Sequence, residues 1–176
     1  ITEIYDYLRV LYARIGEPFC PNCTTRIEKL TIDEMVDMVL DDQRKEKREK
    51  RKVETARGDV SVLAPIVRGR KGEYYQLLYD LYNNGFAKVR IDGEMHRLSE
   101  KIQLSRYQQH TIAVVIDSIP ATMLTGDVTK DARQRLHEAL ETAVERGEGV
   151  AVVVHADGSE RLLSSKFSCV TCGFSF

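Results

Sequence analysis

The chain has 176 residues, 43% of them hydrophobic, and a formal net charge of −1. These values predict a globular protein with one core of ordinary size, and they exclude the general attraction to nucleic acid that a strongly basic chain would have. No stretch approaches the roughly 18 apolar residues that a membrane helix needs, and the usual motifs of phosphate-binding loops, serine hydrolases and zinc proteases are absent.

The first 15 residues place apolar side chains on one face of a helix. These side chains are Ile1, Ile4, Tyr5, Leu8, Leu11, Tyr12 and Ile15. Apolar residues three and four positions apart are typical of an amphipathic helix, so we predict a helix over residues 1–15. No N-cap residue precedes this helix, and the chain ends shortly after a cysteine pair. We therefore expect the chain to be a piece excised from a larger protein.

A second helix is predicted over residues 32–40, and a charged segment follows it. Thr31 and Glu34 form the capping-box pattern, in which each side chain bonds to the backbone amide of the other residue. From Asp41 to Lys52, eleven of twelve residues are charged, seven basic and four acidic. Because the signs are interspersed and no apolar side chain is available for burial, we interpret residues 41–57 as a solvated helical extension or a mobile loop rather than a nucleic-acid patch.

The rest of the chain alternates between strand and helix patterns. Strands are predicted over residues 61–67, 86–91, 94–98, 111–116, 150–154 and 161–167, and helices over residues 74–82 and 131–146. The Asp92-Gly93 pair predicts a hairpin turn, and the β-branched run over 111–116 predicts a central strand. The expected fold class is therefore α/β, an α+β mixed sheet with flanking helices.

Three cations alternate with glycines where the first predicted strand leads into a helix. They are Arg68, Arg70 and Lys71. A structural turn and a partner-binding loop both fit this composition. A nucleotide cradle is less favoured, because the spacing of a phosphate-binding loop is absent and Glu73 puts a negative charge in the first helical turn.

A charged strip is predicted on the second strand, because Lys88 and Arg90 alternate with Val89 and Ile91. Alternate side chains of a strand point to opposite faces, so the cations share one face, and Arg97 extends the strip from the next strand. The strip is either the ordinary solvent-exposed face of a sheet or a surface that pairs with carboxylates of a partner. An arginine on a rigid strand suits the second role.

Two cysteine pairs bracket the chain, Cys20 with Cys23 and Cys169 with Cys172, with 145 residues between the pairs. Two such knuckles are the ligand set of a tetrahedral structural zinc. A loop about ten times longer than usual adds roughly 2 kcal/mol of closure entropy, against about 10–16 kcal/mol from a structural zinc. Two disulfides, a dithiol redox site, or two half-sites completed by cysteines outside the chain remain the alternatives.

The four histidines, His96, His110, His137 and His155, stand alone in the sequence. Catalysis needs a nucleophile, a base and an orienting group in one arrangement, and spacing alone does not suggest one here. We therefore expect these histidines to be surface or core residues.

Several separated motifs, in order, resemble the UvrA family, the damage-recognition subunits of bacterial excinucleases. They are ITEIYDYLRVLYARIGEP at residues 1–18, APIVRGRKG at 64–72, VRIDGE at 89–94, HTI at 110–112, LETA at 140–143 and FSCVTCGFS at 167–175. The resemblance covers nearly the whole chain. It implies a UvrB-binding domain that is inserted into the first ATP-binding half of an ABC-type ATPase and anchored by zinc.

This resemblance also implies a division of the chain and its roles. Residues 1–23 would be the exit helix of the ATPase core and the first knuckle, 24–168 the UvrB-binding domain, and 169–176 the second knuckle. From the predicted exposure of the cations described above, we expect UvrB to face Arg68, Arg70, Lys71, Lys88, Arg90 and Arg97.

The whole parent protein would be a cytoplasmic, homodimeric ATPase of excision repair and the SOS response. It would use ATP and Mg²⁺ and bind DNA, without membrane attachment. This fragment has no ATPase motif, so we expect it not to be an enzyme. The alternative function is a zinc-anchored module of the same protein that contacts DNA directly.

Overall fold

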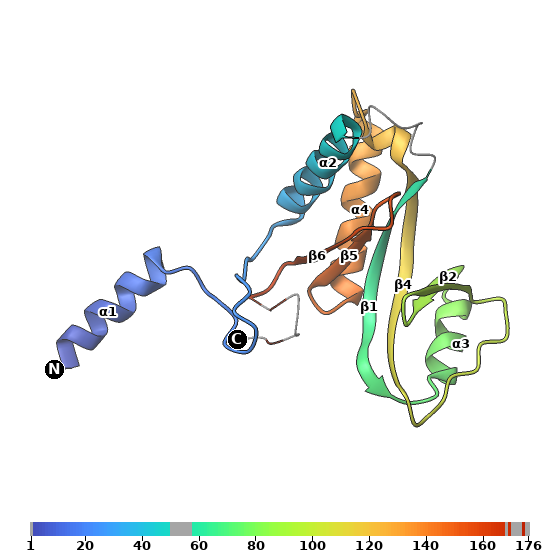
Figure 1. The fold of residues 1–176 in the computed structure, drawn as a ribbon, viewed down its shortest axis with the longest axis horizontal. Coiled ribbons are helices and arrows are strands. Elements are labelled where there is room, and N and C mark those ends of the chain that lie inside the picture. The colour runs from blue at the N-terminus through green and yellow to red at the C-terminus, as the bar shows by residue number, and fades with distance from the viewer. Residues whose placement is uncertain (1, 50–57, 168, 170–173, 175–176) are drawn as a thin grey trace.

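The computed structural model describes residues 2–49, 58–167, 169 and 174, and these form a six-stranded sheet with helices packed on one face (Figure 1). The strands are β1 (Asp59–Lys71), β2 (Lys88–Ile91), β3 (Glu94–Arg97), β4 (Gln109–Pro120), β5 (Val150–Val154) and β6 (Glu160–Ser164). The helices are α1 (Thr2–Ile15), α2 (Ile32–Glu49), α3 (Tyr75–Asn83) and α4 (Lys130–Arg146), with a short 3-10 helix η2 (Ala121–Leu124). The strand order is β3-β2-β4-β1-β5-β6.

Every neighbouring pair of these strands is antiparallel, so the predicted mixed sheet is wrong, whereas the α+β class with flanking helices is confirmed. The strand-helix-strand alternation is present, but each crossover skips one strand. Helix α3 leads from β1 to β2 with β4 between them, and α4 leads from β4 to β5 with β1 between them. The strands that each helix joins are parallel to each other without being neighbours. A sequence pattern does not distinguish this arrangement from a parallel sheet.

Helix α2 begins at the predicted capping box and continues to Glu49 instead of ending at residue 40. The amide of Thr31 donates to Oε2 of Glu34 at 2.8 Å, and the amide of Glu34 donates to Oγ1 of Thr31 at 3.3 Å. The first part of the charged segment is thus helical, and Gln43 within it is only 2% exposed. The segment offers no apolar side chain for burial, as expected, but it buries this polar side chain, whose amide bonds to His155 inside the fold. Residues 50–57 lie outside the described residues.

Helices α2, α3 and α4 share one hydrophobic core with the sheet. Met35 and Val39 of α2 and Leu136 and Leu140 of α4 are fully buried. Burying such a side chain contributes about 1.5–3 kcal/mol each. The helical face of the sheet is therefore occupied, and surfaces for partners must lie elsewhere.

Strand β1 is longer than predicted and includes Arg68, Arg70 and Lys71, for which the sequence predicts a loop. Its pairing with β4 shifts register three times, and two of these shifts lie near its end, between Pro65 and Val67 and between Val67 and Arg70. Such bulges accommodate a proline in a strand and a glycine with positive φ, here Gly69 at 57°. These irregularities led the sequence pattern to suggest a loop.

The hairpin of β2 and β3 has the predicted turn, and the structure settles its register. Ile91 pairs with Glu94, which leaves the two-residue loop Asp92-Gly93. Both loop residues have positive φ, 51° and 95°, as a type I′ turn requires. The neighbouring strand β4 is third of six in the sheet, so the predicted central strand is confirmed.

Helix α1 is also confirmed, and it projects away from the sheet (Figure 1). Its apolar side chains are exposed. Within the described part of the chain, none of the helices combines the length and the apolarity of a membrane span.

Candidate metal centre and cationic face

The first cysteine pair lies in a tight knuckle closed by backbone bonds. The amide of Cys20 donates to the carbonyl of Thr25 at 2.8 Å, and the amide of Thr24 donates back to the carbonyl of Cys20 at 2.9 Å. An isolated bridge between Phe19 and Arg26 extends this closure. The knuckle turns both thiols of the pair toward the same side.

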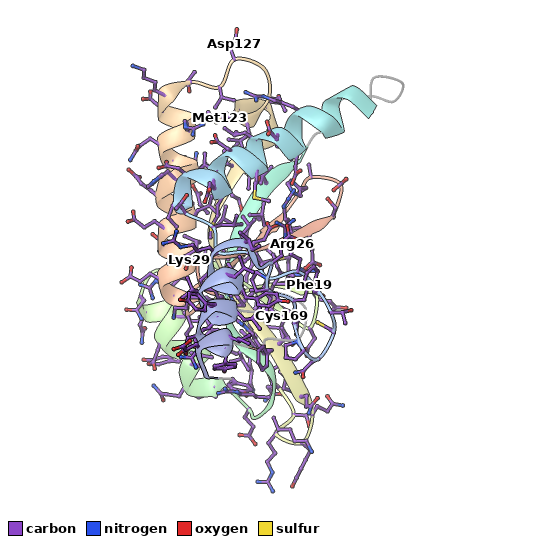
Figure 2. All side chains as sticks on the ribbon, turned by 90° about the vertical axis from the view of Figure 1, so that its left-hand side faces the viewer. Phe19, Arg26, Lys29, Met123, Asp127 and Cys169 are labelled. Atoms are coloured by element: carbon purple, nitrogen blue, oxygen red, sulfur yellow. The ribbon has the colours of Figure 1, made fainter. Side chains whose placement is uncertain are left out.

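Cys169 lies beside this knuckle although 145 residues separate it from Cys23. The sulfur atoms of Cys20, Cys23 and Cys169 all lie within 4.8 Å of one another, and Cys20 and Cys169 are each 1% exposed. Figure 2 shows Cys169 at the level of Phe19 and Arg26. The structure thus brings three of the four predicted ligands together. Cys172 lies outside the described residues.

The spacing of these sulfur atoms fits a shared metal better than a disulfide. The Sγ atoms of Cys23 and Cys169 are 3.3 Å apart, and no disulfide joins any two of the three described cysteines. A disulfide needs about 2.0 Å, whereas two thiolates on one tetrahedral zinc lie about 3.8 Å apart. Hydrogen bonds from the hydroxyl and the amide of Thr25 lower the pKa of the Cys23 thiol, which favours the thiolate form that binds metal.

The six predicted partner-binding cations do not lie on one surface. Lys88 and Arg90 of β2 and Arg97 of β3 share the open face of the sheet, opposite the helices. Arg68 instead donates to the carbonyl of Gly147, at the end of α4, at 2.9 Å. Arg70 and Lys71 are exposed at the end of β1.

Arg90 is not the exposed cation that we expected. Its side chain is 20% exposed and donates through Nη2 to Glu160 on β6, while its Nε donates to the carbonyl of Gly93 at 3.1 Å. The bond to Arg90 lowers the pKa of Glu160, and that to Glu160 raises the pKa of Arg90. Nothing in the sequence pointed to Glu160 as the partner of Arg90. Its only signal was a charge directly before the predicted strand 161–167, 70 residues from its partner.

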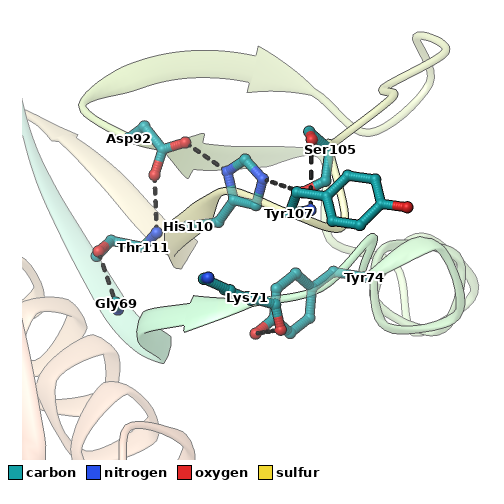
Figure 3. A network of polar contacts seen from close by, with 8 residues as sticks. All are labelled: Gly69, Lys71, Tyr74, Asp92, Ser105, Tyr107, His110 and Thr111. Carbon is teal, nitrogen blue, oxygen red and sulfur yellow. Dashed lines mark hydrogen bonds and ion pairs between the residues drawn. The ribbon is translucent and has the colours of Figure 1, made fainter.

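The buried ring of His110 joins three segments in a polar network (Figure 3). Its Nδ1 lies 2.7 Å from Oδ2 of Asp92, and its Nε2 lies 3.0 Å from the carbonyl oxygen of Ser105. Since both ring nitrogens face oxygen acceptors, both carry a hydrogen and the ring is an imidazolium. The bond to Asp92 raises the pKa of His110 despite burial. Asp92 also accepts a hydrogen bond from the amide of Thr111 at 2.7 Å. The network therefore fixes the turn of the β2–β3 hairpin, called the cationic hairpin below because it carries Lys88, Arg90 and Arg97.

A second polar cluster joins α2 to the hairpin of β5 and β6. The amide of Gln43 lies 2.7 Å from Nδ1 of the buried His155, and Arg161 forms an ion pair with Asp42. Nδ1 of His155 therefore accepts from Gln43, since a side-chain amide nitrogen only donates. The cluster explains why α2 continues past its apolar stripe.

Comparisons with known proteins agree on one family. A model of the UvrA interaction domain matches residues 30–157. The protein named "UvrABC system protein A" is 42% identical over 176 residues in Bacillus subtilis and 39% identical over 176 residues in Clostridium tetani. In Methanothermobacter thermautotrophicus, a protein of the same name is 40% identical over 179 residues.

These alignments include 99% of the chain for the first two relatives and 100% for the third, but only 16–17% of each relative. The chain thus spans about one sixth of the length of the curated relatives it matches. The matched range 30–157 contains α2 to α4 and all strands except β6, and it leaves out α1 and the cysteine knuckles.

Proposed function

Because the chain belongs to the UvrA family, we propose that it is the domain through which a UvrA protein docks UvrB. The observation that carries the proposal is a group of cations on paired strands, Lys88, Arg90 and Arg97, on the open face of a domain that matches the UvrA interaction domain. Cations held on strands suit recognition of carboxylates on a partner protein, because little side-chain entropy is lost on pairing.

A zinc ion held by Cys20, Cys23, Cys169 and Cys172 completes the proposal. Three of these thiols converge, and Cys172 follows Cys169 at knuckle spacing. When bound, zinc would supply a structural crosslink between the two ends of the chain. The buried position of Cys20 and Cys169 supports a structural rather than a catalytic site.

The distribution of charge favours a protein partner over DNA for this domain. The chain carries 26 basic and 27 acidic residues, so it offers little of the net positive charge that drives DNA binding by counterion release. Direct DNA contact is the second candidate, because Arg70 and Lys71 are exposed at the end of β1. We assign no catalysis to the domain. ATP and Mg²⁺ binding, DNA binding, dimerisation and a cytoplasmic location belong to the proposal for the whole parent protein.

Titration of UvrB into the zinc-loaded chain by calorimetry, with and without duplex DNA, tests the proposal. We expect a saturable complex with UvrB alone and no measurable affinity for DNA alone. Arg97→Glu on the open face should weaken the complex, whereas Arg133→Glu on α4 serves as the matched control. If UvrB gives no heat of binding with folded wild-type protein, UvrB docking is rejected. Binding of DNA alone would favour the second candidate.

A further inference from the structure

The open face of the sheet carries a small apolar cluster that no described helix covers. Leu63, Ala113, Val115 and Val152 form this cluster, and Val154 packs against it. All of these residues come from β1, β4 and β5, whereas most buried apolar residues of α2, α3 and α4 belong to the core on the other face. Each of the four residues is at most 8% exposed, so neighbouring side chains already cover the cluster in the unbound domain.

The ion pair between Arg90 and Glu160 spans this face. Arg90 is on β2 and Glu160 on β6, and the strands β4, β1 and β5 lie between them in the sheet. The sheet must therefore curve enough to bring its two outer hairpins together over the cluster. Ala113, a member of the cluster, is the register partner of Arg90 on β4.

The cationic hairpin also contains a like-charged pair. Lys88 and Arg97 are direct cross-strand partners, and both are exposed. Like charges directly opposite each other destabilise a sheet. Among the described residues, neither side chain forms an ion pair. The arrangement is favourable once a carboxylate from another molecule lies between the two cations.

We propose that the open face docks an acidic segment of the partner, and that one partner carboxylate replaces Glu160 on Arg90. This inference rests on the proposed function and adds that Glu160 is an internal competitor. In the unbound domain, Glu160 is paired with the guanidinium of Arg90, and this ion pair closes the face. In the complex, the Glu160 side chain turns into solvent and the face opens to the partner.

The geometry of Arg90 suits such an exchange. Its Nε is held by the carbonyl of Gly93 within its own hairpin, so the guanidinium stays oriented when Nη2 changes partner. The Glu160 side chain is 40% exposed, so its carboxylate regains water when it leaves. Because one carboxylate replaces another, no charge is left buried without a partner.

Calorimetric titration of UvrB against four forms of the zinc-loaded chain tests this inference: wild type, Glu160→Gln, Arg90→Gln and the double variant. We expect Glu160→Gln to tighten binding by about 3- to 5-fold, the strength of a partly exposed ion pair. Arg90→Gln should weaken binding by at least about 10-fold. In the Arg90→Gln background, Glu160→Gln should have no further effect, because the competition is lost.

Asp37→Asn is the matched control. It removes the acid of another ion pair, with Arg133 on the helical face, and changes the net charge equally. This control should leave affinity unchanged. Equal tightening by Asp37→Asn, or wild-type affinity for Glu160→Gln, would overturn the inference while UvrB docking stands. An effect of these substitutions on binding of duplex DNA alone, and not of UvrB, would also overturn it. Failure of folded wild type to bind UvrB would instead reject the proposed function itself.

Discussion

The Nδ1 atom of His110 lies 2.7 Å from Oδ2 of Asp92, so a buried ring in β4 is fixed to the turn of the cationic hairpin. Asp92 has a positive φ of 51°, a conformation that non-glycine residues adopt at some energetic cost. Its carboxylate receives hydrogen bonds from His110 and from the amide of Thr111, which offset that cost. The position of the hairpin therefore depends on the protonation of one histidine.

The first prediction is that stability falls as pH rises through the raised pKa of His110. The pKa lies above the ordinary 6.5 because the ring bonds to Asp92. The stabilisation is complete below pH 6.5 and is lost as the ring deprotonates in the folded state. The Asp92 pKa lies below the ordinary 3.8, so its contribution is lost only as the pH falls further through that lowered value. Between about pH 6 and pH 9, only the histidine of this pair titrates.

Urea unfolding of wild type and Asp92→Asn across that range measures the effect. Asparagine tolerates positive φ, so the turn itself is retained. The stability advantage of the wild type should shrink as the pH rises. Asp127→Asn, at an exposed loop position, is the control and should differ from wild type by a constant amount. A constant difference for Asp92→Asn as well would contradict the imidazolium assignment.

The second prediction concerns the buried amide of Gln43. Replacing Gln43 with alanine removes this donor from Nδ1 of the buried His155. The substitution should lower the free energy of unfolding by about 1–3 kcal/mol. Arg44→Ala is the matched control on the next residue, where an exposed ion pair with Asp41 is worth less than about 1 kcal/mol. Chemical denaturation of both variants gives the comparison. Equal small losses would mean that the charged half of α2 contributes nothing to stability.

The elements that the sequence predicted best are those set by neighbouring residues. The capping box of Thr31 and Glu34 and the type I′ turn at Asp92-Gly93 need only a few adjacent positions, and both are present. Likewise, strand 150–154 has the predicted bounds, because a run of apolar β-branched residues leaves little choice.

The features that could not be predicted depend on which distant element covers a given face. The alternation of residues in β2 predicts that Arg90 lies on the polar face of the strand. It does not predict that Glu160 reaches the same face and pairs with Arg90. His155 and Gln43 likewise stand 112 residues apart, and nothing local links them. The antiparallel sheet was missed for the same reason, since a strand inserted between two others changes their pairing without changing their own sequences.

The third prediction tests the core that supports the open face. Leu140 of α4 is fully buried among the helices and the sheet, so Leu140→Ala should lower the free energy of unfolding by about 2–5 kcal/mol. Leu162→Ala removes the same atoms from a side chain that is 39% exposed on β6, and should cost less than about 1 kcal/mol. Thermal or urea unfolding of both variants gives the comparison. Similar losses of stability from Leu140→Ala and Leu162→Ala would place the main core elsewhere.

The last prediction is one zinc ion per chain, held by Cys20, Cys23, Cys169 and Cys172, with Zn–S distances of about 2.3 Å. The convergence of the first three thiols is its structural basis. Elemental analysis of protein purified without chelator gives the stoichiometry, and X-ray absorption gives the distances. Cys23→Ser should lower zinc retention strongly, because one of four thiolates is lost.

Removal of zinc should affect the region around the cysteines before it affects the rest of the fold. The core of α2, α4 and the sheet shares no buried residue with the cluster of Cys20, Ile27 and Cys169, at least among the described residues. A chelator should therefore expose the cysteines to thiol reagents while most of the circular dichroism signal of the sheet and helices remains. Zinc-free protein with cysteines still protected, or a stoichiometry near two metals per chain, would rule out a single shared site.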